Sequence, residues 1–134
     1  MKISSKTITA IKMFIDLGEH YQDVFISLKD IAERKDISKK FLEQIVPTFK
    51  KNGLLIGTRG NQGGYKLAKE PSKIIISEII YVFENILGKE KINFAPIDNI
   101  MEKADNLLDD LFSNTSLEKL IEEQKESYSY NYSI

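Results

Sequence analysis

Five neighbouring residues, Ser38 to Lys40 together with Glu43 and Gln44, carry side chains suited to reading DNA bases. Lys39 and Lys40 can bind guanine acceptors or a phosphate. Gln44 can form two hydrogen bonds with adenine, and Glu43 can accept one from the amino group of cytosine. We expect Ser38 to cap the helix that carries them and to contact a phosphate. The alternative is an ordinary solvated helix face.

A second candidate DNA-binding element is the glycine-rich segment 59–64. Arg59 suits insertion into a narrow minor groove, where A-tracts concentrate negative potential. We expect Gly60, Gly63 and Gly64 to permit positive φ and close approach to the DNA backbone. The segment lacks the Gly-Lys-Ser/Thr ending of a nucleotide-binding loop. A plain hairpin with a solvated arginine is the alternative.

The sequence predicts neither a catalytic site nor a metal site. It has no cysteine, which excludes disulfides, thiolate nucleophiles, cysteine-ligated zinc and ordinary iron–sulfur clusters. His20 is the only histidine, so we expect a surface residue near a helix end. The carboxylates are scattered over the helix faces. We therefore predict that the chain is not an enzyme and holds no cofactor.

The hydrophobic spacing predicts three helices that position the first candidate element. They run from about Lys6 to Tyr21, from Ser27 to about Lys35, and from Ser38 to an Asn52-Gly53 stop. A short turn between the second and third is typical of a helix-turn-helix. Pro47 should kink the third helix; an end at Val46 is the alternative.

A β-hairpin follows and positions the second candidate element. Strands are predicted at 54–58 and 65–67, on either side of the glycine-rich turn. A fourth helix should begin at Ser77, include Ile86 and stop at Gly88. A helix-turn-helix followed by a hairpin is the order of a winged helix.

A long acidic helix after residue 94 carries the sequence's strongest amphipathic pattern. Its apolar stripe is wider than a small winged-helix core can cover, which predicts a homodimer interface. Folding back onto its own winged helix is the alternative. A capping box at 115–118 should open a short last helix. The predicted dimerisation residues are Ile97, Ile100, Met101, Ala104, Leu107, Leu108, Leu111 and Phe112.

The two halves of the chain carry opposite net charge. Residues 1–73 hold 14 Lys and Arg against 8 Asp and Glu, whereas residues 74–134 hold 5 against 12. Such a split indicates a nucleic-acid-facing segment joined to a different one, with chance clustering of solvated charges as the alternative.

Several of these motifs, in their order and spacing, resemble the Rrf-two family of small bacterial winged-helix transcription regulators. The resemblance covers residues 1–6, 27–34, 37–44 and 52–54, and is most specific at the wing, where Arg59-Gly60 and Gly63-Gly64-Tyr65 match. It implies a homodimer on a palindromic operator. Phe41 stands where the family usually has tyrosine, and the segment before Ile97 lacks the three cysteines of cluster-binding members. Cluster sensing is therefore not expected.

The predicted fold is mainly α with a small β-hairpin: a winged helix-turn-helix plus a long C-terminal dimerisation helix. The DNA-binding domain should span 1–88, the dimerisation region 89–127, and a tail that could be disordered 128–134.

These elements predict a DNA-binding transcription regulator, a repressor that binds double-stranded DNA as a homodimer. The alternative is a winged-helix module that docks a partner protein. No apolar run approaches the ~20 residues that span a bilayer, and the start lacks a signal-peptide core, so we expect a cytoplasmic protein without membrane contact. Its signal could be an unknown small effector or a partner protein.

Overall fold

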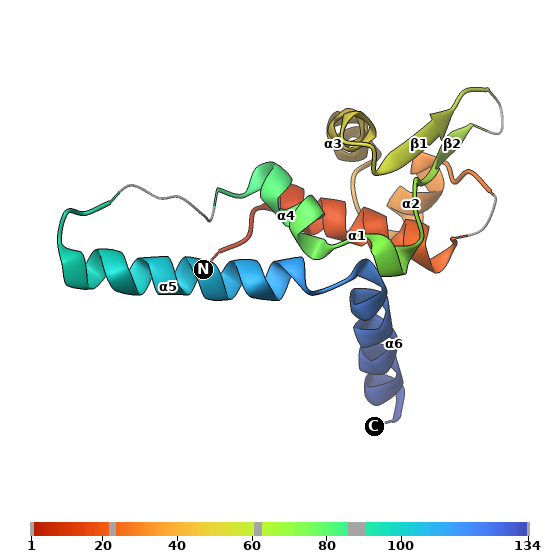
Figure 1. Ribbon diagram of the computed structural model, residues 1–134. Coiled ribbons are helices and arrows are strands. Elements are labelled where there is room, and N and C mark those ends of the chain that lie inside the picture. The colour runs from red at the N-terminus through yellow and green to blue at the C-terminus, as the bar shows by residue number, and fades with distance from the viewer. Residues whose placement is uncertain (1, 22–23, 61–62, 86–90, 134) are drawn as a thin grey trace.

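The computed structural model describes residues 2–21, 24–60, 63–85 and 91–133. Over these ranges the chain forms six α-helices, one short 3-10 helix and a two-stranded antiparallel hairpin (Figure 1). The predicted fold class is confirmed. The elements are α1 (Ser5–Glu19), α2 (Leu28–Lys35), α3 (Lys39–Lys51), β1 (Leu55–Thr58), β2 (Gly64–Leu67), η1 (Pro71–Lys73), α4 (Ile76–Phe83), α5 (Ala95–Ser113) and α6 (Leu117–Ser133).

Serine side chains cap the first three helices, and the predicted cap at Ser38 is confirmed. The hydroxyl of Ser27 accepts from the Asp30 N–H at 3.1 Å, and that of Ser38 from the Phe41 N–H at 3.2 Å. Ser4 does the same for α1. Each cap satisfies a backbone donor that has no partner inside the helix. Between α2 and α3 the chain turns at Asp36, whose φ is 53°.

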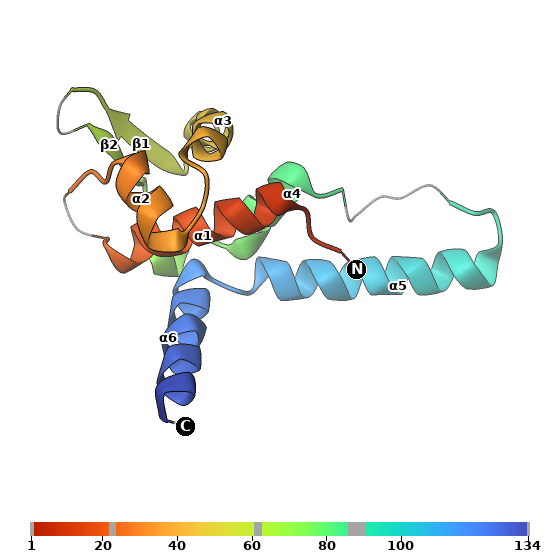
Figure 2. The same ribbon diagram turned by 180° about the vertical axis from the view of Figure 1, so that it is seen from behind.

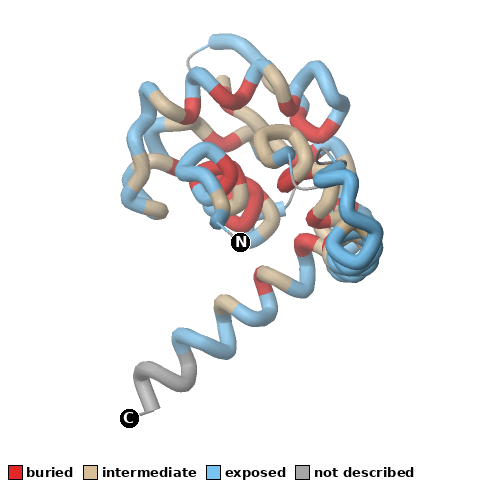
Figure 3. The backbone as a smooth tube through the Cα atoms, turned by 90° about the vertical axis from the view of Figure 1, so that its left-hand side faces the viewer, coloured by how far each residue is buried: buried red, intermediate tan, exposed pale blue. Residues whose placement is uncertain are grey.

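The core forms where α1 meets α3 and α4. Phe14 on α1 packs edge-on against Phe49 on α3, with ring centroids 4.9 Å apart. Phe49 in turn contacts Phe83 on α4 at 5.7 Å. Met13 and Leu17 of α1 are buried beside them. In Figure 3 most of the buried segments, coloured red, lie in the body of the molecule.

Helix α3 continues through Pro47 to Lys51, so the alternative end at Val46 is wrong. Phe49, one turn further on, is fully buried and holds the last turn against α1. The predicted stop is confirmed: Gly53 has a φ of 79° and donates to the Lys50 carbonyl. The kink at Pro47 stays a prediction.

Two helices differ in length from the prediction. The α4 helix begins at Ile76 and ends at Phe83, and Glu84 is already extended, with φ −106° and ψ 132°. The Glu84 side chain accepts hydrogen bonds from Ser4 and Thr7 at the start of α1. The predicted continuation to Ile86 and Gly88 lies outside the described residues.

The last helix is longer than predicted, because it runs to Ser133 instead of giving way to a tail at residue 128. No glycine or proline follows Leu117, so no residue interrupts the helical backbone.

Helix α5 runs alongside the body and then beyond it, while α6 leaves the body in a different direction (Figures 1 and 2). The Tyr81 hydroxyl on α4 donates to Asp109 on α5 at 2.9 Å. Backbone bonds from Ile76 N to Thr115 O and from Leu117 N to Ile74 O, both 2.8 Å, fix the turn between α5 and α6. No helix within the described ranges is long and apolar enough to cross a membrane.

Candidate nucleic-acid interface

The predicted recognition residues lie on one exposed side of α3. All five, Ser38, Lys39, Lys40, Glu43 and Gln44, are exposed. The opposite side of the helix, with Leu42 and Ile45 among others, is buried in the core. Packing therefore decides which side of α3 faces outward.

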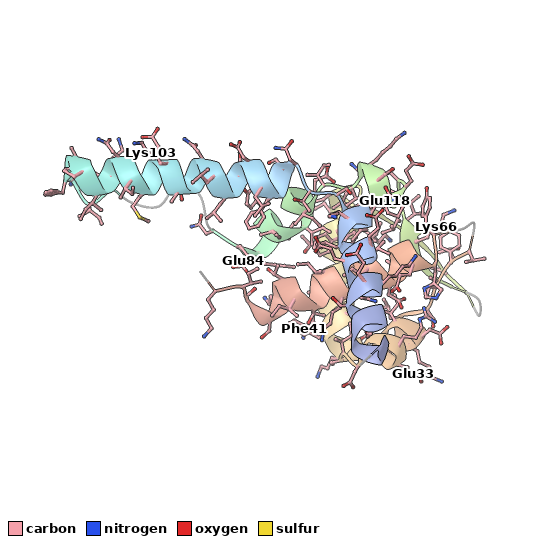
Figure 4. The ribbon with its side chains drawn as sticks, turned by 90° about the horizontal axis from the view of Figure 1, so that it is seen from below. Glu33, Phe41, Lys66, Glu84, Lys103 and Glu118 are labelled. Carbon is pink, nitrogen blue, oxygen red and sulfur yellow. The ribbon has the colours of Figure 1, made fainter. Side chains whose placement is uncertain are left out.

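Two features of this side of α3 affect its charge and orientation. Lys39 Nζ lies 3.9 Å from Glu43 Oε1 in an exposed pair, which solvent keeps weak. Phe41, labelled in Figure 4, is half-buried and packs against the core.

The wing and the start of α3 border the same shallow groove of about 380 Å³. Arg59 and Gly60 are exposed at the hairpin end, and Lys39 at the start of α3 lines the groove with them. The first turn of α2 completes it with Ser27 and Lys29. The fold thus brings the two elements predicted from the sequence together and adds a third.

Lys29 and the N-terminal turn of α2 are the part of this groove that the site prediction missed. Lys29 is exposed, and the unpaired backbone donors of a helix N-terminus favour anions such as phosphate. A signal was present in the sequence, because Ser27 at the predicted start of this helix is a residue type that caps helices. A capping residue marks where a helix begins in the sequence, but it does not show which surface of the fold that end of the helix faces.

The wing glycines act in different ways. Gly60 has a positive φ of 109°, as predicted. A Cβ on Gly63 would lie 2.8 Å from the carbonyl oxygens of Gly60 and Thr58. Gly63 and Gly64 must be glycine because neighbouring backbone atoms leave no room for a Cβ.

Gly64 is buried and packs against the segment before α2. A Cβ there would lie 2.3 Å from the Ile26 carbonyl oxygen. The neighbouring Tyr65 exchanges two backbone hydrogen bonds with Ile26, at 2.8 and 2.9 Å. We therefore assign Gly64 the role of letting the wing pair with this segment.

A bidentate ion pair that sequence reasoning missed joins α1 to α2. Arg34 donates to both carboxylate oxygens of Asp16, each at 2.8 Å. Asp16 is buried, and this hydrogen bond raises the pKa of Arg34. His20, predicted near a helix end at the surface, is exposed just past α1, with Nδ1 2.8 Å from the Asp16 carbonyl oxygen.

The predicted dimerisation stripe on α5 separates into two groups. Phe112 is buried and contacts the ring of Tyr81 on α4, and Leu108 is half-buried against the same core. These two residues attach α5 to its own body. The other six are exposed: Ile97, Ile100, Met101, Ala104, Leu107 and Leu111.

The family model described as "Rrf2: Iron-dependent Transcriptional regulator" matches residues 3–123. The HTH-type transcriptional regulator IscR of Photorhabdus laumondii is 38% identical over 84 residues, 63% of this chain and 51% of that protein. Protein rrf2 of Nitratidesulfovibrio vulgaris is 33% identical over 86 residues, 64% of this chain and 57% of that protein. The chain thus spans about half the length of these curated relatives.

Solved structures match over nearly the whole chain. IscR of T. potens has a TM-score of 0.80 at 32% identity, covering 97% of this chain and 96% of that one. The global cysteine regulator CymR of B. subtilis has a TM-score of 0.83 at 30% identity, covering 91% and 97%. Both likenesses support a winged-helix fold.

The residues present do not fit an iron–sulfur cluster. Cluster iron is held mainly by thiolates, and the chain has no cysteine and one histidine. Across the described residues, no three side chains of the metal-binding types gather into a group that could hold an ion.

Proposed function

This chain belongs to the Rrf2 family of DNA-binding transcription regulators, and we propose that it is a repressor that binds a palindromic operator as a homodimer. Membership of a regulator family means that the chain is not an enzyme. The finer proposal rests on one observation: Lys39 at the start of α3, Arg59 of the wing and the N-terminus of α2 border one groove. Lys40, Glu43 and Gln44 are exposed on the same helix.

Two kinds of DNA contact belong to this proposal, base reading by α3 and minor-groove insertion by the wing. Lys40, Glu43 and Gln44 face outward from the first half of α3, the part of a recognition helix that meets base edges. Glu43 can remain near DNA only where it finds a base donor, so it should contribute selectivity more than affinity. Arg59 would enter the minor groove beside them.

A dimer is supported by the exposed apolar side chains of α5. Leu107 is 70% exposed, and Ile100 and Leu111 are each 60% exposed. A helix of 19 residues is about 28 Å long, so paired α5 helices could hold two recognition helices about one DNA turn apart. Such a dimer would repress most simply by occupying the operator and blocking polymerase.

The test is selection of bound fragments from the source genome by the full chain, followed by affinity measurements across a salt series. Phosphate contacts release counterions, so affinity should fall steeply with salt, and the selected sites should be two-fold symmetric. In the Glu43→Ala variant, the consensus should relax at one position in each half-site. Selection of no sequence, with binding to a protein partner instead, would favour the docking-module alternative.

A further inference from the structure

An exposed Asn-Gly pair forms the junction between the recognition helix and the wing. Asn52 is the C-cap of α3, with φ −79° and ψ 0°, and Gly53 follows it with a φ of 79°. Both residues are exposed. A Cβ built on Gly53 would have no neighbouring heavy atom within 4 Å among the described residues. Neither a side chain on Gly53 nor another element therefore covers this turn.

This pair has a chemistry that the other asparagines of the chain do not share. Asparagine is a thermolabile residue, because its side-chain carbonyl carbon can be attacked by the main-chain nitrogen of the next residue. A side chain on the next residue hinders that attack, and glycine has none. The other seven asparagines are followed by glutamine, threonine, phenylalanine, tyrosine, leucine or isoleucine. Asn52 is thus the asparagine of this chain whose attack is least hindered.

We propose that Asn52 is a site of spontaneous deamidation. The Gly53 nitrogen loses its proton to hydroxide and bonds to the side-chain carbonyl carbon of Asn52. The bond from that carbon to the amide nitrogen breaks, and the nitrogen takes up a proton and leaves as ammonia. Water then opens the succinimide ring at one of its two carbonyl carbons. Opening at the side-chain carbon gives an ordinary aspartate, and opening at the main-chain carbon gives an isoaspartate.

The fold slows this reaction without preventing it. The Gly53 N–H donates to the Lys50 carbonyl at 3.1 Å, which holds the attacking nitrogen in the helix cap. The bond lies at an exposed helix end, where local opening requires little free energy. Attack therefore requires the last turn of α3 to fray, and we expect the folded chain to react more slowly than the unfolded chain.

The isoaspartate product should disturb the placement of the wing, because it adds a carbon atom to the main chain between Asn52 and Gly53. The Leu54 N–H spans this point by donating to the Phe49 carbonyl at 3.0 Å. The Leu54 carbonyl accepts from the Ala68 N–H at 2.9 Å, which ties the same residue to the end of the hairpin. Phe49 and Leu54 are both buried, so a longer connection between them strains the core.

The test is peptide mapping by mass spectrometry of the full chain after incubation at mildly alkaline pH, both folded and in urea. Conversion of amide to acid is expected first at Asn52, in two products that co-elute with synthetic aspartate and isoaspartate peptides, and faster in urea. Asn106 is the internal control, because it is exposed on α5 and is followed by leucine. Folded-chain conversion at Asn52 no greater than at Asn106 would overturn the proposal. No DNA is present, so the result does not depend on the proposed function.

Two variants separate the chemistry from its consequence. Gly53→Asn keeps a residue type that tolerates positive φ and adds a side chain into open space, so it should fold and lose the conversion at Asn52. Asn52→Asp supplies the ordinary product. The aged fraction that contains isoaspartate should unfold at lower urea than Asn52→Asp. Undiminished conversion in Gly53→Asn would contradict the route through the Gly53 nitrogen, and equal stability of the aged fraction and Asn52→Asp would contradict the effect on the wing.

Discussion

Arg34 on α2 donates two hydrogen bonds of 2.8 Å to the buried carboxylate of Asp16 on α1. The Arg34 side chain is 39% exposed, whereas that of Asp16 is 1% exposed. The pair therefore holds α1 and α2 together where they cross. Asp16 lies in the interior, and the Arg34 guanidinium stays in contact with water. Because α3 follows α2 after one tight turn, this contact also helps to orient the recognition helix.

Removal of Arg34 should destabilise the fold, because it leaves the Asp16 charge buried without its partner. We expect Arg34→Ala to lower the free energy of unfolding by about 1–3 kcal/mol, less than for a fully buried pair because Arg34 is partly solvated. Urea denaturation measures this change. Lys73→Ala, which removes an exposed pair at 3.9 Å, should change stability by less than about 0.5 kcal/mol. Equal effects of the two variants would show that the Asp16 contact contributes little.

Glu84 should make stability depend on pH. It accepts hydrogen bonds from the Ser4 N–H and the Thr7 hydroxyl, each at 2.7 Å, and these lower its pKa below the usual 4.5. Stability from Glu84 is therefore present above the unfolded-state pKa and is lost as pH falls through the lower, folded-state pKa. Glu84→Gln should unfold at lower urea than the native chain at pH 7, and the difference should shrink in acid. A difference that is constant from pH 7 to pH 3 would exclude this linkage.

The DNA contacts can be tested by single charge removals. Arg59→Ala and Lys40→Ala should each weaken operator binding and reduce the salt dependence by about one counterion, because both side chains are exposed, Arg59 on the wing and Lys40 on α3. Lys103→Ala is the matched control, since Lys103 is exposed on the projecting part of α5 (Figure 4). Thermal unfolding of all three variants should match the native chain. Unchanged affinity in both the Arg59→Ala and Lys40→Ala variants at equal salt would reject this docking face.

Gly64 can be tested as a packing residue instead of a DNA contact. In Gly64→Ala the new methyl group meets the Ile26 carbonyl, so the wing must move away from the segment before α2. We expect a loss of about 1–3 kcal/mol in unfolding free energy. Thr58→Ala changes the exposed cross-strand neighbour and should be nearly neutral. A Gly64→Ala variant that is as stable as the native chain but fails to bind DNA would instead support Gly64 as a DNA contact.

Much of this architecture could be predicted because the signals are local. Ser27 and Ser38 mark helix starts by satisfying nearby backbone donors, and Gly53 marks a helix end by adopting positive φ. The Asp16–Arg34 pair was missed because its members are 18 positions apart and meet only through the crossing of α1 and α2.

The limits are clearest on α5. Its periodicity predicted one apolar side, but periodicity does not say what covers each residue. Phe112 contacts the chain's own Tyr81, whereas its neighbour Leu111 is exposed. Which part of the stripe belongs to the body depends on where α4 lies, and that is a property of the tertiary fold.

The difference between buried and exposed residues on α5 decides which substitutions can test the dimer. A disruptive change at Leu108 or Phe112 would also damage the body, so the informative substitutions are at Leu107 and Leu111, which are 70% and 60% exposed. The double variant Leu107→Asp, Leu111→Asp should sediment as a folded monomer and lose cooperative binding to a two-half-site operator, since charges cannot be buried in an apolar interface without partners. Asn106→Asp adds a charge to the same helix at an exposed position off the stripe and should remain dimeric. Sedimentation of the unmodified chain as a monomer at micromolar concentration would contradict the dimer directly.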